Sequence, residues 1–308
     1  MRRRIDGHVH IIQPHPVGWI DPLNHIEVLP NGRIRRPSGD VGQRVPAYCG
    51  DGAFPVETLI ATMDENGVDK AVIMAHLDSE VCETAYDAIQ KYPDRLAGAI
   101  AVVPDAAQAE TIRFWHEKGI RVLKFELRSM NEMYPGFTLA DDPVQPLLKT
   151  AEELGMVVAV DPGPTDFPCY RPDCLKMVAQ RYPGIKLVIC HLGYPLMGLR
   201  DRPEIYEKWL ETIRLGRLDN VYFDVTAMPD LFLRENFPYP EGITFLKELY
   251  ETCGAHKLIW GTDMPGTFRN ATYTQMIQAF ERADFLTESE KDALFYANAN
   301  VIYFSCEK

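Results

Sequence analysis

Short apolar runs alternate along the chain with longer segments in which apolar residues recur three or four positions apart. The short runs are typical of strands buried on both faces, and the longer segments are typical of helices with one buried side. The strands predicted in this way are residues 5–12, 68–75, 96–103, 120–127, 156–161, 185–191, 221–226 and 257–263. The predicted helices are residues 56–66, 80–92, 106–118, 142–155, 172–182, 202–215, 242–253, 272–283 and 287–298.

Turn and capping residues support several of these boundaries. Gly67 and Gly119 follow the first and third helices. Asp142-Pro143-Val144-Gln145 combines a capping residue, a proline at the first helical position and a glutamine at the third, which predicts a helix start. Thr287-Glu288-Ser289-Glu290 has the pattern of a capping box and predicts the start of the last helix.

Eight strand–helix units in succession, with strands that are apolar nearly throughout, indicate a parallel sheet covered by helices. At 308 residues, eight units favour closure into a single-domain (β/α)8 TIM barrel over an open doubly wound sheet. The first strand is not followed by a glycine-rich phosphate loop, which argues further against a dinucleotide-binding fold.

One long stretch, residues 13–54, interrupts the alternation after the first strand. It is rich in proline and glycine, carries Arg33, Arg35, Arg36 and Arg44, and shows no clear periodicity. Irregular segments of this length inside a compact domain are uncommon and usually functional. We therefore expect an irregular insertion that acts as a lid.

Composition narrows the class of protein. The hydrophobic share of 46% is ordinary for a soluble globular protein, and the net charge of −12 argues against nucleic acid as a partner. The seven cysteines include no Cys-x-x-Cys pair, so neither a disulfide framework nor a zinc knuckle is indicated. No apolar run approaches the roughly 18 residues of a membrane span, and the three N-terminal arginines precede no signal-peptide core. We expect a reduced, cytoplasmic protein without a membrane partner.

The first strand carries polar residues at alternate positions. Side chains alternate between the faces of a strand, so Asp6, His8 and His10 are expected on one face. Two imidazoles at this spacing can reach one metal ion. Alone, a His-x-His pair is a weak signal for a metal site.

Further titratable residues stand at the ends of other predicted strands, where a barrel places its active site. Asp161, His191 and Asp263 close the fifth, sixth and eighth strands, and Lys124 and Glu126 lie near the end of the fourth. If the barrel closes, these side chains surround one mouth together with His8 and His10.

The motifs DGHVH (6–10), ICHLGYP (189–195) and WGTDMP (260–265), spread over eight βα units, resemble the amidohydrolase superfamily. Within it, the chain is similar to the branch that includes small metal-dependent hydrolases, lactonases and non-oxidative decarboxylases. The resemblance implies that His8 and His10 bind a divalent metal, with zinc the first expectation and manganese the second. It implies that Asp263 binds the metal or takes a proton from the attacking water, and that His191 acts as an acid or base.

The chain departs from this pattern on the fifth strand, where Asp161 stands in place of the usual histidine ligand. A carboxylate can serve there and would favour harder metals. Asp161 could instead cap the Asp-Pro-Gly turn. Glu126 could bridge a second metal, but an ion pair with Lys124 is the favoured interpretation. Candidates for substrate binding are Arg128, Arg171, Tyr194 and His76.

Three hypotheses follow. The first is a metal-dependent hydrolase that cleaves an amide or an ester or lactone bond of a small molecule with a metal-activated water. The second is a metal-dependent decarboxylase of an aromatic or unsaturated acid, because an arginine-bearing lid suits a carboxylate substrate. The third, a non-catalytic binding protein, is disfavoured by the joint presence of His8, His10, His191 and Asp263. Homo-oligomers are compatible with all three.

Overall fold

Eight parallel strands form one sheet in the computed structural model, which describes residues 2–49, 52–78 and 80–305. Their order follows the chain: β1 (Ile5–Val9), β5 (Lys70–Ile73), β6 (Leu96–Ile100), β7 (Val122–Glu126), β8 (Val157–Asp161), β9 (Lys186–Ile189), β10 (Val221–Asp224) and β11 (Leu258–Ile259). The two edges meet, because Gly7 N donates to Trp260 O (2.9 Å) and Asp263 N donates to His8 O (2.8 Å). The predicted (β/α)8 barrel is confirmed.

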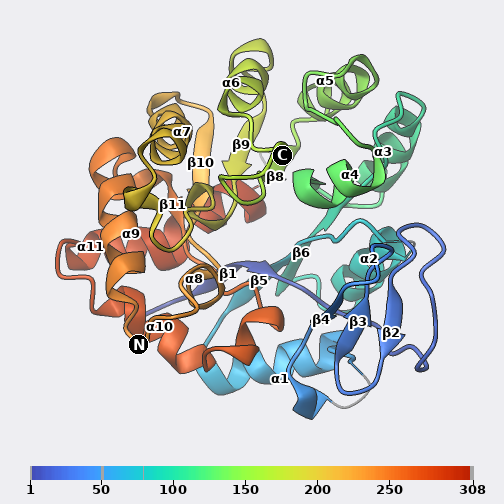
Figure 1. The fold of residues 1–308 in the computed structure, drawn as a ribbon, viewed down its shortest axis with the longest axis horizontal. Helices are drawn as coiled ribbons and strands as arrows, with labels where there is room; N and C mark the ends of the chain where they lie inside the picture. The colour runs from blue at the N-terminus through green and yellow to red at the C-terminus, as the bar shows by residue number, and fades with distance from the viewer. Residues whose placement is uncertain (1, 50–51, 79, 306–308) are drawn as a thin grey trace.

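Helices surround these strands (Figure 1). They are α1 (Val56–Asn66), α2 (Val81–Lys91), α3 (Gln108–Glu117), α4 (Leu127–Met133), α5 (Gln145–Glu153), α6 (Pro172–Arg181), α7 (Pro203–Arg214), α8 (Met228–Leu231), α9 (Pro240–Cys253), α10 (Tyr273–Glu281) and α11 (Glu288–Asp292). Every residue of β1 and β7 is buried, as expected for strands covered on both faces. None of the described helices is long and apolar enough to cross a membrane.

Helix capping agrees only in part with expectation. Gly67 ends α1 with φ of 64°, and Thr287 forms the predicted capping box with Glu290. Asp142, however, lies inside a short 3-10 turn (Asp142–Val144) that precedes α5, and the N-cap position belongs to Asp141. The predicted capping role of Asp142 is therefore wrong. The short helices α4 and α8 were not predicted, because each is too brief to show a helical period.

The predicted strands at 185–191 and 257–263 end early. His191 and Asp263 adopt left-handed backbone conformations, with φ of 59° and 63°. Non-glycine residues rarely occupy this region, and such conformations take the chain out of a strand. Both side chains therefore lie in tight turns just beyond β9 and β11 rather than within the sheet.

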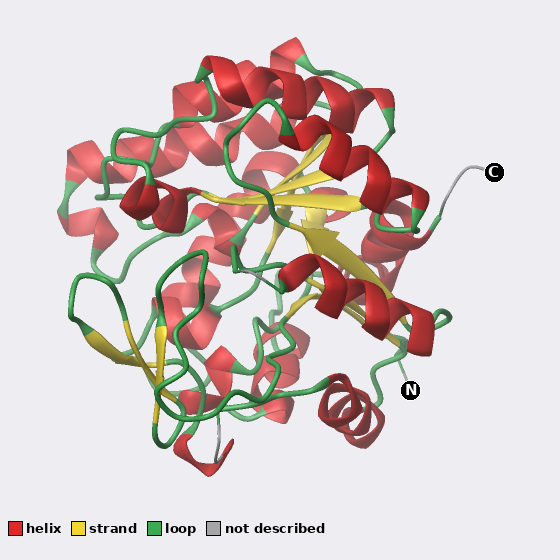
Figure 2. Cartoon of the chain, turned by 90° about the vertical axis from the view of Figure 1, so that its right-hand side faces the viewer, coloured by secondary structure: helices red, strands yellow, loops and turns green. Residues whose placement is uncertain are grey.

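The insertion after β1 is not irregular. It contains a three-stranded antiparallel sheet made of β2 (Glu27–Leu29), β3 (Arg33–Arg35) and β4 (Val41–Gln43). Strands of three residues are too short for their alternation to stand out among prolines and glycines, so the sequence pattern hides them. In Figure 2 this small sheet lies at the left, at the end of the barrel away from both termini.

Hydrogen bonds at several points hold the insertion in place, among them the two described next. At its base, Ile12 and Phe54 exchange backbone hydrogen bonds of 2.9 and 2.8 Å. Near the end of β4, Arg269 donates to Gln43 O over 2.5 Å. Because Arg269 belongs to the segment that follows Asp263, this bond ties the insertion to the eighth βα loop.

Asp6 has a different role from the two histidines that follow it. A β-bulge between Asp6 and Val9 breaks the regular alternation of β1. The Asp6 carboxylate accepts hydrogen bonds from Thr262 Oγ1 (2.6 Å), Tyr273 OH (2.7 Å) and the backbone N–H groups of Thr262 and His8. It therefore joins β1 to the end of β11 and to α10. The expectation that Asp6 shares the histidine face is corrected.

Replacing Asp6 with asparagine should destabilise the fold by about 2–3 kcal/mol, because the new amide group would face hydrogen-bond donors in a buried site. Thermal unfolding monitored by circular dichroism measures this effect. Asp40→Asn is the matched control, since Asp40 lies exposed in a turn of the insertion. Equal melting temperatures for the Asp6 variant and the wild type would contradict the role given to Asp6.

Candidate active site

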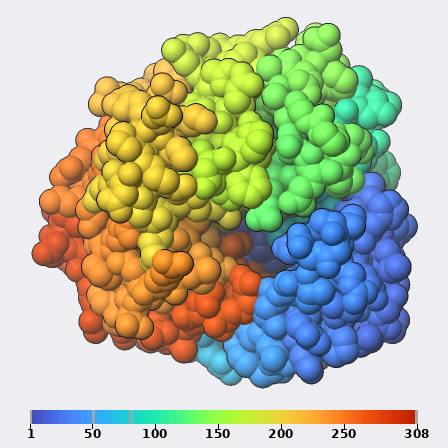
Figure 3. Space-filling model, viewed as in Figure 1, coloured from blue at the N-terminus to red at the C-terminus, as the bar shows by residue number. Residues whose placement is uncertain are grey.

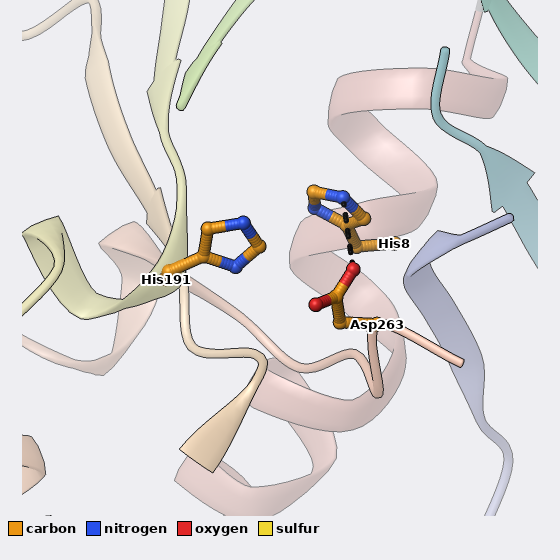
Figure 4. Close-up of side chains that lie close together, drawn as sticks. All are labelled: His8, His191 and Asp263. Carbon is orange, nitrogen blue, oxygen red and sulfur yellow. Dashed lines mark ion pairs between the residues drawn. The ribbon is translucent and has the colours of Figure 1, made fainter. Parts of the chain in front are cut away.

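His8, His191 and Asp263 converge at the mouth of the barrel. One ligand atom from each lies within 4.8 Å of the others, and His8 Nε2 is 3.6 Å from Asp263 Oδ1. Figure 4 shows the Asp263 carboxylate beneath the His8 ring, with His191 facing both from across the site. Figure 3 shows a hollow at the centre of the viewed face of the molecule, between segments that are distant in sequence. The predicted convergence of these three residues is found.

His10 joins the same group. Its Nε2 lies 3.0 Å from Asp263 Oδ1, and its ring centroid is 5.1 Å from that of His8. Its Nδ1 lies 2.8 Å from Met74 O. A carbonyl oxygen can only accept, so the proton of neutral His10 is on Nδ1 and the Nε2 lone pair faces Asp263.

The other two histidines are oriented in the same way. His8 Nδ1 lies 2.9 Å from Asp224 Oδ2, and this carboxylate accepts the proton of Nδ1. His191 Nδ1 lies 2.7 Å from Thr226 Oγ1. The Thr226 hydroxyl donates its own proton to Asp224 Oδ1 (2.6 Å), so it must accept from His191. In the neutral state, all three rings therefore present an Nε2 lone pair to the mouth, the arrangement that outer-sphere partners impose on metal-binding histidines.

Asp224 is the main functional residue that the sequence analysis missed. Besides His8 and Thr226, it accepts from the backbone N–H of His191 over 2.7 Å, and it is fully buried. Burial opposes its charge, but the adjacent His8 outweighs that effect and holds the pKa of Asp224 below its usual range. Its place at the end of β10 is the signal that could have found it, since strand ends carry the other site residues.

Burial determines the charge of the site. Burial and the charge of Lys124 lower the pKa of His8 to about 3, and burial lowers the pKa of His10 well below its usual value. Burial raises the pKa of Asp263 to about 7. The charges of His191 and Lys124 oppose this rise without cancelling it. Imidazole lone pairs and carboxylate oxygens are ligands that zinc and manganese accept in proteins. The donor set fits a divalent metal.

His191 differs from the other two histidines. Burial disfavours its charged form, but the carboxylates of Asp161, Asp263 and Asp224 more than compensate and raise its pKa. Its Nε2 lies 3.7 Å from Asp161 Oδ2. His191 is therefore the histidine of this group best suited to carry a proton near neutral pH.

The Asp161 carboxylate caps the turn that follows β8 and also faces the site. Its Oδ1 accepts from Gly163 N over 2.9 Å, which is the predicted turn cap, while Oδ2 faces His191. The cluster with ligand atoms within 4.8 Å of one another does not include it. Its role as a ligand stays a prediction.

Lys124 and Glu126 form the predicted ion pair. Their Nζ and Oε1 atoms lie 3.4 Å apart, and Lys124 Nζ is also 3.4 Å from His8 Nε2. Glu126 additionally accepts from Leu77 N and lies 2.9 Å from His76 Nδ1. With these partners the carboxylate is engaged, which favours the ion pair over a second metal bridge.

The candidates for substrate binding lie in different places. His76 stacks on His10 with ring centroids 3.9 Å apart, and Tyr194 packs edge-on against His191 at 5.7 Å. The Tyr194 hydroxyl has no hydrogen-bond partner within the described part of the chain. Arg128 lies at the rim, paired with Glu132 and placed 5.2 Å from the Phe167 ring. Arg171 pairs with Asp173 on the exposed start of α6, so the structure does not bring it to the site.

Comparison with known proteins gives one family. A family model described as Amidohydrolase matches residues 5–304. A search of curated protein sequences finds no match.

Several solved structures share the fold. One is a probable 2-pyrone-4,6-dicarboxylic acid hydrolase from Acinetobacter baumannii with bound citric acid, 21% identical, with a TM-score of 0.71 and 98% of both chains covered. Another is an amidohydrolase from Burkholderia multivorans with bound zinc, 15% identical, with a TM-score of 0.72, covering 97% of this chain and 98% of that one. A dihydroxybenzoic acid decarboxylase from Polaromonas sp. JS666 with bound manganese is 15% identical, with a TM-score of 0.56, covering 79% and 84%.

Replacing Asp161 with histidine should change which metal the site prefers. If Asp161 is a ligand, a softer imidazole in its place should raise the ratio of bound zinc to bound manganese several-fold. Elemental analysis after incubation with both metals measures this ratio, and His10→Ala is the reference variant that should lose metal. Wild-type content and ratio in the Asp161 variant would mean that Asp161 only caps its turn.

Proposed function

The chain belongs to the amidohydrolase family, and we propose that it is a metal-dependent hydrolase that opens an ester or lactone bond, or an amide bond, of a small carboxylated molecule. The observation that carries this proposal is the convergence of inward-facing Nε2 lone pairs on the partly buried carboxylate of Asp263. The chain is an enzyme of the amidohydrolase type. Its reaction and substrate are the parts that we propose here.

His8, His10 and Asp263 are the residues that would hold the ion, with Asp161 as a further ligand. A divalent metal bound there would lower the pKa of a coordinated water and polarise the substrate oxygen. We propose zinc first and manganese second. The zinc of the Burkholderia multivorans protein and the manganese of the Polaromonas decarboxylase support both choices.

Two residues divide the proton transfers. Asp263, whose pKa burial raises to about 7 in the site without a metal, would accept a proton from the attacking water. His191, whose pKa neighbouring carboxylates raise, donates a proton to the leaving oxygen or nitrogen. A base and an acid whose pKa values differ in this way from their ordinary ones are typical of catalytic pairs. The unpartnered hydroxyl of Tyr194 lies beside His191 and can donate to a substrate oxygen.

Hydrolysis is favoured over decarboxylation by the extent of the structural likeness. The dicarboxylic acid hydrolase aligns over 98% of this chain, whereas the dihydroxybenzoic acid decarboxylase aligns over 79%. Decarboxylation is the second candidate, since the same residues would hold a carboxylated ring and His191 would protonate the carbon that loses CO₂. In either case we propose that residues 13–54 act as a lid on a single catalytic domain that works in the cytoplasm, alone or as a homo-oligomer.

Metal removal and product analysis test the reaction. We expect purified protein to contain zinc or manganese, and dialysis against dipicolinate to abolish hydrolysis of carboxylated lactones or amides until metal is restored. Asp263→Asn should lower the rate at least 100-fold, because it removes the proton acceptor. Asp40→Asn is the exposed control.

Two results would contradict this account. Activity that persists in the metal-free protein would remove the metal from the mechanism. Release of CO₂ from aromatic acids, without hydrolysis of any lactone or amide, would favour the second candidate.

A further inference from the structure

A pocket lies beside the metal-binding histidines, between the insertion and the barrel. The space free of protein atoms, including open solvent at the entrance, is about 630 Å³. The barrel contributes His76 and Met74 to its lining, and the insertion contributes Trp19, Asn24 and Arg44.

Arg44 is the unusual member of this lining. It is only partly exposed, and within the described residues its guanidinium makes no hydrogen bond and no ion pair. Burial lowers its pKa, although Asp78, Glu126 and Asp21 attract its charge from a distance. An enclosed guanidinium whose five donors lack acceptors is costly unless a ligand supplies them.

Each of the neighbouring acids accepts at least one hydrogen bond from a donor other than Arg44. Asp78 Oδ1 accepts from Glu80 N over 3.1 Å, and Asp21 Oδ1 accepts from the backbone N–H groups of Leu23 and Asn24 over 2.8 and 2.9 Å. Glu126 is held by His76, Leu77 and Lys124. Within the described residues, these contacts leave the guanidinium of Arg44 without an acceptor at the edge of the pocket.

The backbone around Arg44 is fixed from two sides. Its own N–H donates to Gly32 O over 2.9 Å, and the preceding carbonyl of Gln43 accepts from Arg269 over 2.5 Å. The side chain is therefore presented from an anchored strand end, which limits the entropy lost when a ligand binds.

The rest of the pocket suits a flat apolar body. Ile11, Ile73 and Trp19 line it, and the Trp19 indole stacks on His15 with centroids 3.7 Å apart. On the side of the active site, the pocket ends at His76, whose ring stacks on His10. Met74, which also lines the pocket, accepts the Nδ1 proton of His10. The pocket and the metal-binding histidines are thus separated by a single imidazole.

We propose that Arg44 binds a carboxylate of the substrate bidentately in this pocket, and that it thereby restricts the enzyme to small acids with a flat apolar body. The proposal deepens the function proposed above and rests on it for the reaction. Carboxylate binding itself depends only on the pocket, so it can be measured without turnover.

Binding of 4-fluorobenzoate, followed by ¹⁹F NMR titration of the protein as purified, tests the assignment. The wild type should bind this acid and should bind the uncharged analogue 4-fluorobenzamide at least tenfold more weakly. Arg44→Gln should weaken 4-fluorobenzoate binding about 10- to 100-fold, the effect of losing hydrogen bonds to a charged group, and should leave the amide unchanged. Arg44→Lys should fall between the two, because it keeps the charge and loses the bidentate geometry.

Arg33→Gln is the matched control, since Arg33 is an exposed arginine of the same small sheet. Thermal unfolding of each variant checks the fold. If Arg44→Gln unfolds, the 4-fluorobenzoate affinity of Arg44→Lys tests the proposal in its place. Equal 4-fluorobenzoate affinity in the wild type and the Arg44 variants, or no saturable binding to the wild type, would overturn the proposal.

The same data separate this proposal from the proposed reaction. Arg44-dependent binding without hydrolysis of any carboxylated lactone or amide would leave the pocket assignment standing and refute the reaction. Hydrolysis of carboxylated substrates by Arg44→Gln at an unchanged KM would support the reaction and refute the pocket assignment.

Discussion

Asp224 accepts hydrogen bonds from His8, from Thr226 and from the backbone of His191, and the geometry of the site depends on this carboxylate. Through Thr226 it also determines which nitrogen of His191 carries the proton in the neutral ring. One buried group, Asp224, therefore holds the imidazoles of His8 on β1 and of His191 after β9 in defined orientations. Without Asp224, no carboxylate would orient the rings of His8 and His191 so that both Nε2 atoms face the mouth.

The backbone conformations of His191 and Asp263 also determine the geometry of the site. His191 and Asp263 each follow the end of a strand and have positive φ. The cost of these conformations is offset by barrel closure, in which Asp263 N donates to His8 O and the Asp6 carboxylate joins β1 to Thr262 and Tyr273. The framework bonds of Asp6 and the mouth position of Asp263 are thus two consequences of the same junction between the first and the last strand.

Much of this arrangement could be predicted from the sequence, because it follows from local rules. Alternation of strands and helices indicated the barrel, and the rule that barrel sites lie at the carboxyl ends of strands selected His8, His10, His191 and Asp263. The same rule covers Asp224 at the end of β10, but its role as the shared acceptor of His8, Thr226 and His191 depends on how the fold brings these residues together. The small β2–β4 sheet was also hidden, because three-residue strands leave no recognisable period.

The arginines also show what the sequence alone does not reveal. Arg44, Arg128 and Arg171 look equivalent in the sequence, yet Arg128 and Arg171 pair with acids two to four residues further along the chain and Arg44 faces a pocket. Whether an arginine is free for a ligand depends on the acceptors around it, which only the folded structure defines. Arg44 of the insertion and His76 line the same pocket, and His76 stacks on His10 of the histidine site.

The central claim is that inward-facing imidazoles and Asp263 together hold one divalent metal. X-ray absorption spectroscopy of the metal-loaded protein tests it most directly, because outer-shell scattering identifies imidazole ligands. The account predicts at least two imidazole nitrogens together with carboxylate oxygen in the first coordination shell. A shell of oxygen alone, with no imidazole scattering, would contradict it.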